Sequence, residues 1–184
     1  MQSMILLAGT VIFSIIYLLI GPRDLDANFP YLVFIEACLF SLIICTSHTI
    51  QRKKIILIFP ILAGLLNLIL FAVWPFILAV PSLIIEAFDF SMAVNSMIGF
   101  AVYSAIGSIA FCALVDLMIQ PNYFSYKAYV YTAVLSLTAG VPFLIFESYF
   151  LVIHKIIWFC SFSAGLILAE QHKEPEPMSL IKDN

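Results

Sequence analysis

The chain has 184 residues, of which 64% are hydrophobic and only 10% are charged. Soluble domains average about 25% charged residues, so this chain has too few to cover a water-facing surface. Its 8 basic and 11 acidic residues give a net charge of −3, which argues against nucleic-acid binding because that function needs clustered basic side chains. The composition predicts an integral membrane protein.

Unbroken apolar runs indicate that the chain crosses the bilayer as helices rather than as a β-barrel. Residues 55–59, for example, are all apolar, whereas the strands of a barrel alternate polar and apolar side chains. A helix crosses the hydrocarbon core in about 20 residues. We therefore predict an all-α polytopic fold with a single transmembrane domain over 1–169. Its six expected spans are, in chain order, 3–20, 31–50, 55–74, 92–118, 128–146 and 149–169.

Prolines and a polar tail interrupt or end this pattern. Pro75 opens and Pro81 interrupts the stretch 75–91, which is too short to cross the membrane by itself and also absorb a proline. We predict a re-entrant or interfacial segment there; a full crossing would raise the count to seven spans. Pro142 is expected to bend the fifth span. The polar tail 170–184 is predicted to be disordered.

The single basic cluster, Arg52-Lys53-Lys54, decides the predicted orientation. Short basic loops stay in the cytoplasm, which places both chain ends inside and the loop 21–30 outside. The first span has no basic residue before it and no small-residue cleavage pattern after it, so we expect it to be retained. The expected location is the cell membrane, meaning the inner membrane of a bacterium or a plasma membrane.

Ionisable residues at membrane level are costly and usually have a partner or a function. With the orientation above, six of them fall in the outer half of the membrane: Glu36, Glu86, Asp89, Glu147, His154 and Lys155. We interpret them as an outward-facing acidic vestibule for a small solute or cation, with Glu36 as its deepest member. The alternative is that all except Glu36 and His154 lie at the water interface or extend their side chains to it.

Two spans carry small residues four positions apart, a spacing that lets helix backbones approach closely. They are Ser104, Ser108 and Cys112 in the fourth span and Ser161, Gly165 and Ala169 in the sixth. These faces are predicted to pack against each other or against another membrane protein. Asn67 is expected to form a hydrogen bond between helices. The four cysteines include no C-x-x-C pair and are expected to be free thiols packed as small apolar groups.

Motifs for catalysis, cofactors or metals are missing from the sequence. It has no phosphate-binding loop, dinucleotide motif, nucleophile elbow or zinc-protease motif, and no two histidines share a helical face. Ser148 and His154 are the nearest approach to a nucleophile and its base, but a separation of six residues is a poor helical register. We therefore expect no cofactor, no metal and no enzymatic activity.

Three classes of function remain open. The first is a small transport-type protein or membrane subunit, in which the vestibule receives a solute or cation and the segment 75–91 acts as a lid. In length and number of spans the chain resembles the substrate-capture subunits of energy-coupling transporters, which implies capture of a small molecule. The second is a non-catalytic partner of another membrane protein, such as an immunity, exclusion or assembly subunit. The third is a membrane enzyme that acts on lipid.

Overall fold

The computed structural model describes residues 2–20, 29–47, 53–86, 91–118, 124–145 and 150–171. In this part of the chain all regular structure is helical, which confirms the predicted all-α class. The helices are α1 (Gln2–Ile20), α2 (Phe29–Ser47), α3 (Lys53–Glu86), α4 (Met92–Met118), α5 (Tyr126–Ser136), the 3-10 helix η1 (Leu137–Gly140), α6 (Pro142–Ile145) and α7 (Phe150–Gln171). The predicted tail beyond Gln171 lies outside the described residues.

The lengths and compositions of these helices fit a polytopic membrane protein. Four stretches of the described chain are long and apolar enough to cross a membrane, and α1 and α2 contribute two shorter apolar helices. The four stretches are Ile58–Phe76, Ala93–Met118, Tyr126–Ile145 and Phe150–Gln171. Large apolar side chains such as Leu19, Phe76 and Leu117 point outward and are largely exposed, as expected where lipid rather than water surrounds the helices.

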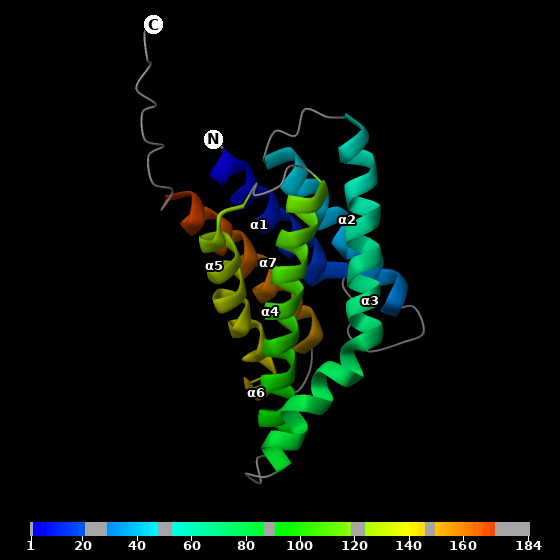
Figure 1. Cartoon of the computed structure of the whole chain (residues 1–184), viewed down its shortest axis with the longest axis vertical. Coiled ribbons are helices and arrows are strands. Elements are labelled where there is room, and N and C mark those ends of the chain that lie inside the picture. Colours follow the sequence, from blue (N-terminus) through cyan, green and yellow to red (C-terminus); the bar gives the residue numbers. More distant parts are fainter. Residues whose placement is uncertain are drawn as a thin grey trace, which may run out of the picture.

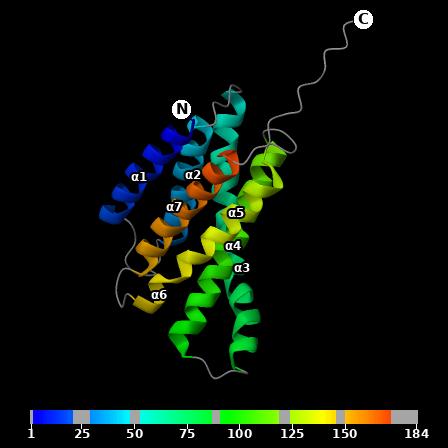
Figure 2. The same ribbon diagram turned by 90° about the vertical axis from the view of Figure 1, so that its left-hand side faces the viewer.

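The six long helical segments form a closed ring. Each helix from α1 to α4 packs against the next one in the chain. Helix α5 packs against α7, and α7 packs against α1, which closes the ring. Neighbours in the ring run in opposite directions, so α1 begins and α7 ends at the same end of the bundle (Figures 1 and 2). The interior is rich in aromatic rings, and Phe40 of α2 contacts Phe159 of α7 across it, with 4.4 Å between the ring centroids.

Helix α3 corrects the expectation of a separate segment over 75–91. It is one helix of 34 residues that continues through Pro75 and Pro81 to Glu86. Its length of about 50 Å exceeds the hydrocarbon core of about 30 Å, and the hairpin of α3 and α4 projects beyond the other helices (Figure 2). The second half of α3, which holds both prolines, changes direction (Figure 1). A proline kinks a helix without ending it when its neighbours hold the rest in place.

The fifth span breaks where Pro142 predicted a bend. The α-helix gives way to η1 at Leu137, and α6 begins at Pro142. Because proline has no backbone N–H, it cannot donate to the carbonyl of Thr138. The N–H of Val141 donates to that carbonyl instead, at 3.1 Å, and this shorter connection is the 3-10 turn.

Candidate functional site

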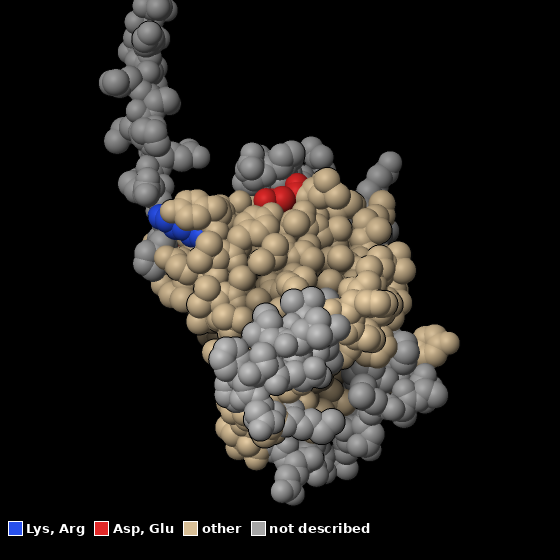
Figure 3. Space-filling model, turned by 60° about the horizontal axis from the view of Figure 1, so that its bottom comes forward, with Lys and Arg blue, Asp and Glu red and all other residues tan. Residues whose placement is uncertain are grey.

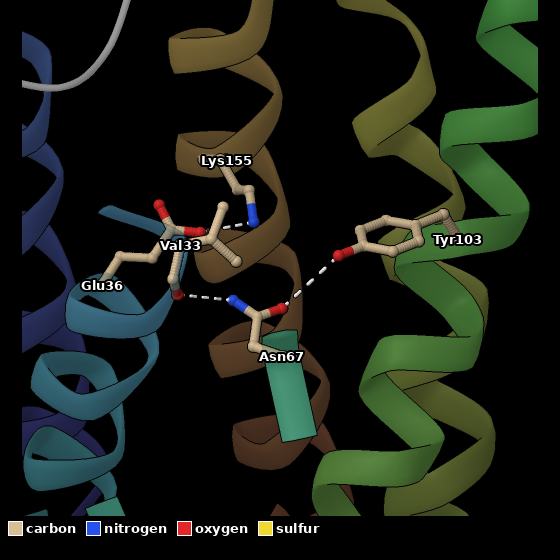
Figure 4. Close-up of polar contacts among 5 residues, drawn as sticks. All are labelled: Val33, Glu36, Asn67, Tyr103 and Lys155. Atoms are coloured by element: carbon tan, nitrogen blue, oxygen red, sulfur yellow. Dashed lines mark hydrogen bonds and ion pairs between the residues drawn. The ribbon is translucent and has the colours of Figure 1, made fainter. Parts of the chain in front are cut away.

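The most unusual feature inside the ring is an ion pair between α2 and α7. The Nζ atom of Lys155 lies 2.5 Å from Oε1 of Glu36, and both side chains are buried (Figure 4). Glu36 shares the inward face of α2 with Val33 and Phe40, at helical spacing. Both residues lie within about the first two turns of their helices, near the end of the bundle where α1 finishes.

This pair has hydrogen-bonding capacity that the described residues do not use. Apart from the ion pair itself, neither oxygen of Glu36 nor the ammonium of Lys155 has a hydrogen-bond partner among them. The ammonium lies 4.9 Å from the centre of the Trp158 ring, one turn along α7, which is within the range of a cation–π interaction. Tyr17 of α1 and Tyr103 of α4 are close enough to Glu36 to interact with its charge.

Asn67 of α3 connects three helices beside the ion pair, as its position in an apolar span predicted. Its Nδ2 atom donates to the backbone carbonyl of Val33 on α2 at 2.9 Å, and its Oδ1 accepts a long bond of 3.5 Å from the Tyr103 hydroxyl (Figure 4). Val33 lies one turn before Glu36. These bonds therefore fix the segment of α2 that carries the carboxylate.

His154 belongs to a different environment, although it precedes Lys155 in the sequence. Its Nδ1 atom lies 2.7 Å from the carbonyl oxygen of Ala139 in η1, and because a carbonyl only accepts, Nδ1 carries the proton. The imidazole packs edge-on against Phe100 and Phe143, and its Nε2 has no hydrogen-bond partner in the described chain. His154 thus supports the break in the fifth span and forms no hydrogen bond with Glu36.

The structure brings together two of the six predicted vestibule residues. Glu36 and Lys155 are paired, and Lys155 is buried rather than extended to the interface, so the alternative interpretation is wrong for this lysine. Glu86 ends α3, but its side chain lies outside the described part, as do Asp89, Glu147 and the neighbouring Ser148. The shared vestibule of all six therefore stays a prediction.

A small cavity of about 20 Å³, with room for about one water molecule, lies between α2, α3, α4 and α7, and neither Glu36 nor Lys155 lines it. Its lining is aliphatic and aromatic except for the amide of Asn67, and it includes Ala37, Phe40 and Trp158. The described surface shown in Figure 3 is likewise uncharged over most of its area, with charged atoms only toward one rim. No group of three potential metal ligands occurs among the described residues, and their four cysteines are free thiols, as predicted.

The small-residue face of α4 packs on α5 within the chain. Ser108 lies 2.6 Å from Ser136, oxygen to oxygen, and accepts a hydrogen bond of 2.9 Å from the Trp158 indole. The sulfur of Cys112 lies 3.6 Å from the Thr132 hydroxyl. At the end of the same face, Asp116 accepts hydrogen bonds from the Phe124 N–H and the Tyr129 hydroxyl, both at 2.8 Å, and so holds the start of α5.

The small-residue face of α7 meets α5 and η1 from the other side. The Ser161 hydroxyl lies 3.0 Å from that of Thr138, and a Cβ added at Gly165 would lie 2.7 Å from the backbone of Thr132. Ala169 is buried as well. Of the two packing partners expected for these faces, α5 was not one. Its Thr132 and Ser136 are four residues apart, a signal that would have identified it.

Comparisons with protein-family models, with curated proteins and with solved structures found no match. The function is therefore argued from the geometry of the ring and of the buried pair.

Proposed function

We propose that the chain is a small transport-type protein, or a membrane subunit of a transporter, in which Glu36 and Lys155 form the polar site for a small solute or cation. One observation carries the proposal. A carboxylate and an ammonium lie paired inside a ring of apolar helices, with further hydrogen-bonding capacity that the described residues leave unused.

Stability alone does not account for such a pair. Removing two charges from water costs several kcal/mol per ion, and replacing a buried ion pair by apolar residues is often neutral or stabilising by about 1–4 kcal/mol. Ionisable residues within membrane helices therefore mark substrate, ion or proton pathways by default.

The proposed orientation follows from the basic cluster before and within the start of α3. If Arg52, Lys53 and Lys54 lie in the cytoplasm, so do the start of α1 and the end of α7, because these lie at the same end of the ring (Figure 1). The ion pair then lies in the outer half of the cell membrane. A solute arriving from outside would reach it from the end where α2 and α7 begin.

Flux measurements on purified protein test this proposal. The chain is reconstituted in liposomes of phosphatidylethanolamine and phosphatidylglycerol, and the entry of protons, Na⁺ and K⁺ is followed with entrapped fluorescent indicators under an imposed membrane potential. We expect flux above that of protein-free liposomes, and we expect Glu36→Gln to abolish it. Asp116→Asn is the matched control, because this carboxylate also lies at membrane level but only holds the start of α5.

The same variants separate the second class of function. A non-catalytic partner protein of the immunity, exclusion or assembly kind would show no flux, and Glu36→Gln would leave its association with another membrane protein unchanged. That class has lost one source of support, since both small-residue faces contact α5 within the chain. Flux that is equal in the wild type, Glu36→Gln and empty liposomes would favour it over transport.

A further inference from the structure

The surroundings of Glu36 discriminate between the ions that it could bind. The titratable groups that face it come from three helices: Tyr17 of α1, Tyr103 of α4 and Lys155 of α7. From α3 the amide of Asn67 bonds to Val33, one turn before Glu36, and to Tyr103. His154 faces Ala139 instead. Among the described residues, Glu36 therefore stands as a single carboxylate next to an ammonium.

This arrangement offers too few oxygen ligands for a metal cation. Transporters that bind Na⁺ within the membrane supply several oxygens, including backbone carbonyls from unwound helices. Here α2 and α7 are continuous helices on both sides of Glu36 and Lys155, so their carbonyls are used within the helices. The ammonium already occupies Oε1 of the carboxylate, and it would have to leave before a metal ion could take its place.

A proton needs only one lone pair, and the structure offers a place for the ammonium that it displaces. Oε2 of Glu36 has no hydrogen bond of good geometry among the described residues, the Tyr17 hydroxyl being the donor close to the carboxylate, and the side chain is only 3% exposed. The Lys155 ammonium already lies over the face of the Trp158 ring. Cation–π attraction there is strongest where water is excluded, at about 2 kcal/mol, so the freed charge keeps a partner.

We infer that the ion which this site binds during transport is a proton, taken up by Glu36. An O–H bond forms on the carboxylate, the contact between Nζ and Oε1 breaks, and Lys155 keeps its three protons and stays on Trp158. The site changes from a net charge of zero to a net charge of +1, and loss of the proton restores the pair. This inference rests on the proposed transport function and names the ion that would drive it.

Trp158 connects the pair to the rest of the ring. Its indole N–H donates to Ser108 of α4, which contacts Ser136 of α5, and the same ring forms part of the cavity wall. Trp158 thus places the Lys155 ammonium next to the cavity wall and links it to α4 and α5.

The fluorescence of Trp158 tests the inference directly. The chain has two tryptophans, so Trp74→Phe leaves Trp158 as the sole reporter. Its emission is recorded in lipid nanodiscs between about pH 4 and about pH 9, a range that spans ordinary and strongly shifted carboxyl groups. We expect a shift in emission that fits a single-proton transition. Replacing choline by Na⁺ or K⁺ at constant ionic strength is expected to leave the emission unchanged.

Three variants make the result decisive. Glu36→Gln in the Trp74→Phe background must remove the transition, and Asp116→Asn in that background must retain it. If Glu36→Gln does not fold, Glu36→Asp in the Trp74→Phe background takes its place: it keeps a carboxyl group at this position but shortens the side chain, so the midpoint of the transition must move. Absence of that transition, its survival in Glu36→Gln, or a response to Na⁺ or K⁺ that depends on Glu36 overturns the inference.

The fluorescence test of the proton site and the flux test of transport can give different results, and each combination has its own meaning. A proton transition at Glu36 without flux in liposomes refutes transport by the chain alone and leaves the proton site standing. Glu36-dependent flux of Na⁺ or K⁺ without a proton transition supports transport and refutes the proton as its ion.

Discussion

Two of the polar contact groups within this ring of apolar helices differ in kind. In the middle of α4, α5 and α7 the contacts are neutral and short, and the hydroxyls of Ser108 and Ser136 meet each other and the Trp158 indole. Between α2 and α7 the contact is charged, and Glu36 and Lys155 leave hydrogen-bonding capacity unused among the described residues.

The difference shows which polar residues serve packing and which need another explanation. Small hydroxyl residues let backbones approach and add hydrogen bonds of about 0.6 kcal/mol on average within a membrane. A buried ion pair contributes little or nothing to net stability, although breaking it by removing one partner is costly. The neutral contacts of α5 are thus sufficient as structure, whereas the charged contact of α2 and α7 points to function.

The largest expected effect comes from replacing one partner of the ion pair. Lys155→Met leaves the Glu36 carboxylate buried without its partner, and we expect a loss of about 3–5 kcal/mol in the free energy of unfolding. The double variant Glu36→Gln with Lys155→Met removes both charges and should recover most of that loss. Unfolding by denaturing detergent in mixed micelles measures both. A double variant as unstable as Lys155→Met would mean that the pair itself supplies net stability.

A smaller effect is expected where η1 packs against α4. A Cβ at Gly140 would collide with the backbone oxygen of Met97 and lie 2.9 Å from the Cβ of Ala101, so Gly140→Ala should cost about 1–3 kcal/mol. Gly9→Ala is the control with a smaller expected loss, because the nearest atom to its Cβ would be the Cγ2 methyl of Ile43, a side-chain rather than a backbone atom, and alanine favours helix. The same unfolding assay compares them, and equal losses would contradict the close packing at Gly140.

The smallest effect concerns one neutral contact of α4. Ser108→Ala removes the acceptor of the Trp158 indole N–H and the partner of Ser136, so we expect a loss of about 1 kcal/mol. Ser104 is equally buried, but its hydroxyl bonds to the Phe100 carbonyl of its own helix, so Ser104→Ala should change the free energy of unfolding far less. Indistinguishable losses would show that the bond to Trp158 contributes nothing between helices.

Much of the architecture could be predicted from the sequence because it depends on local properties. The lengths of the apolar runs indicated helices and their approximate bounds, and the missing N–H of Pro142 indicated the break before α6. Pro75 and Pro81 were misleading, because a proline predicts a kink but not whether the helix resumes after it. Here α3 resumes and runs to Glu86, packed against α4.

Composition and the order of apolar runs therefore determined that this is a helical membrane protein. Counting residues from the start of the second span placed Glu36 well inside it. Only the tertiary structure decided that Lys155 is its partner and that α5 lies between the small-residue faces of α4 and α7. The physical reason is that these helices are apolar on all sides. Such a sequence carries little information on how a helix is rotated about its axis, and that rotation is set by packing against neighbouring helices.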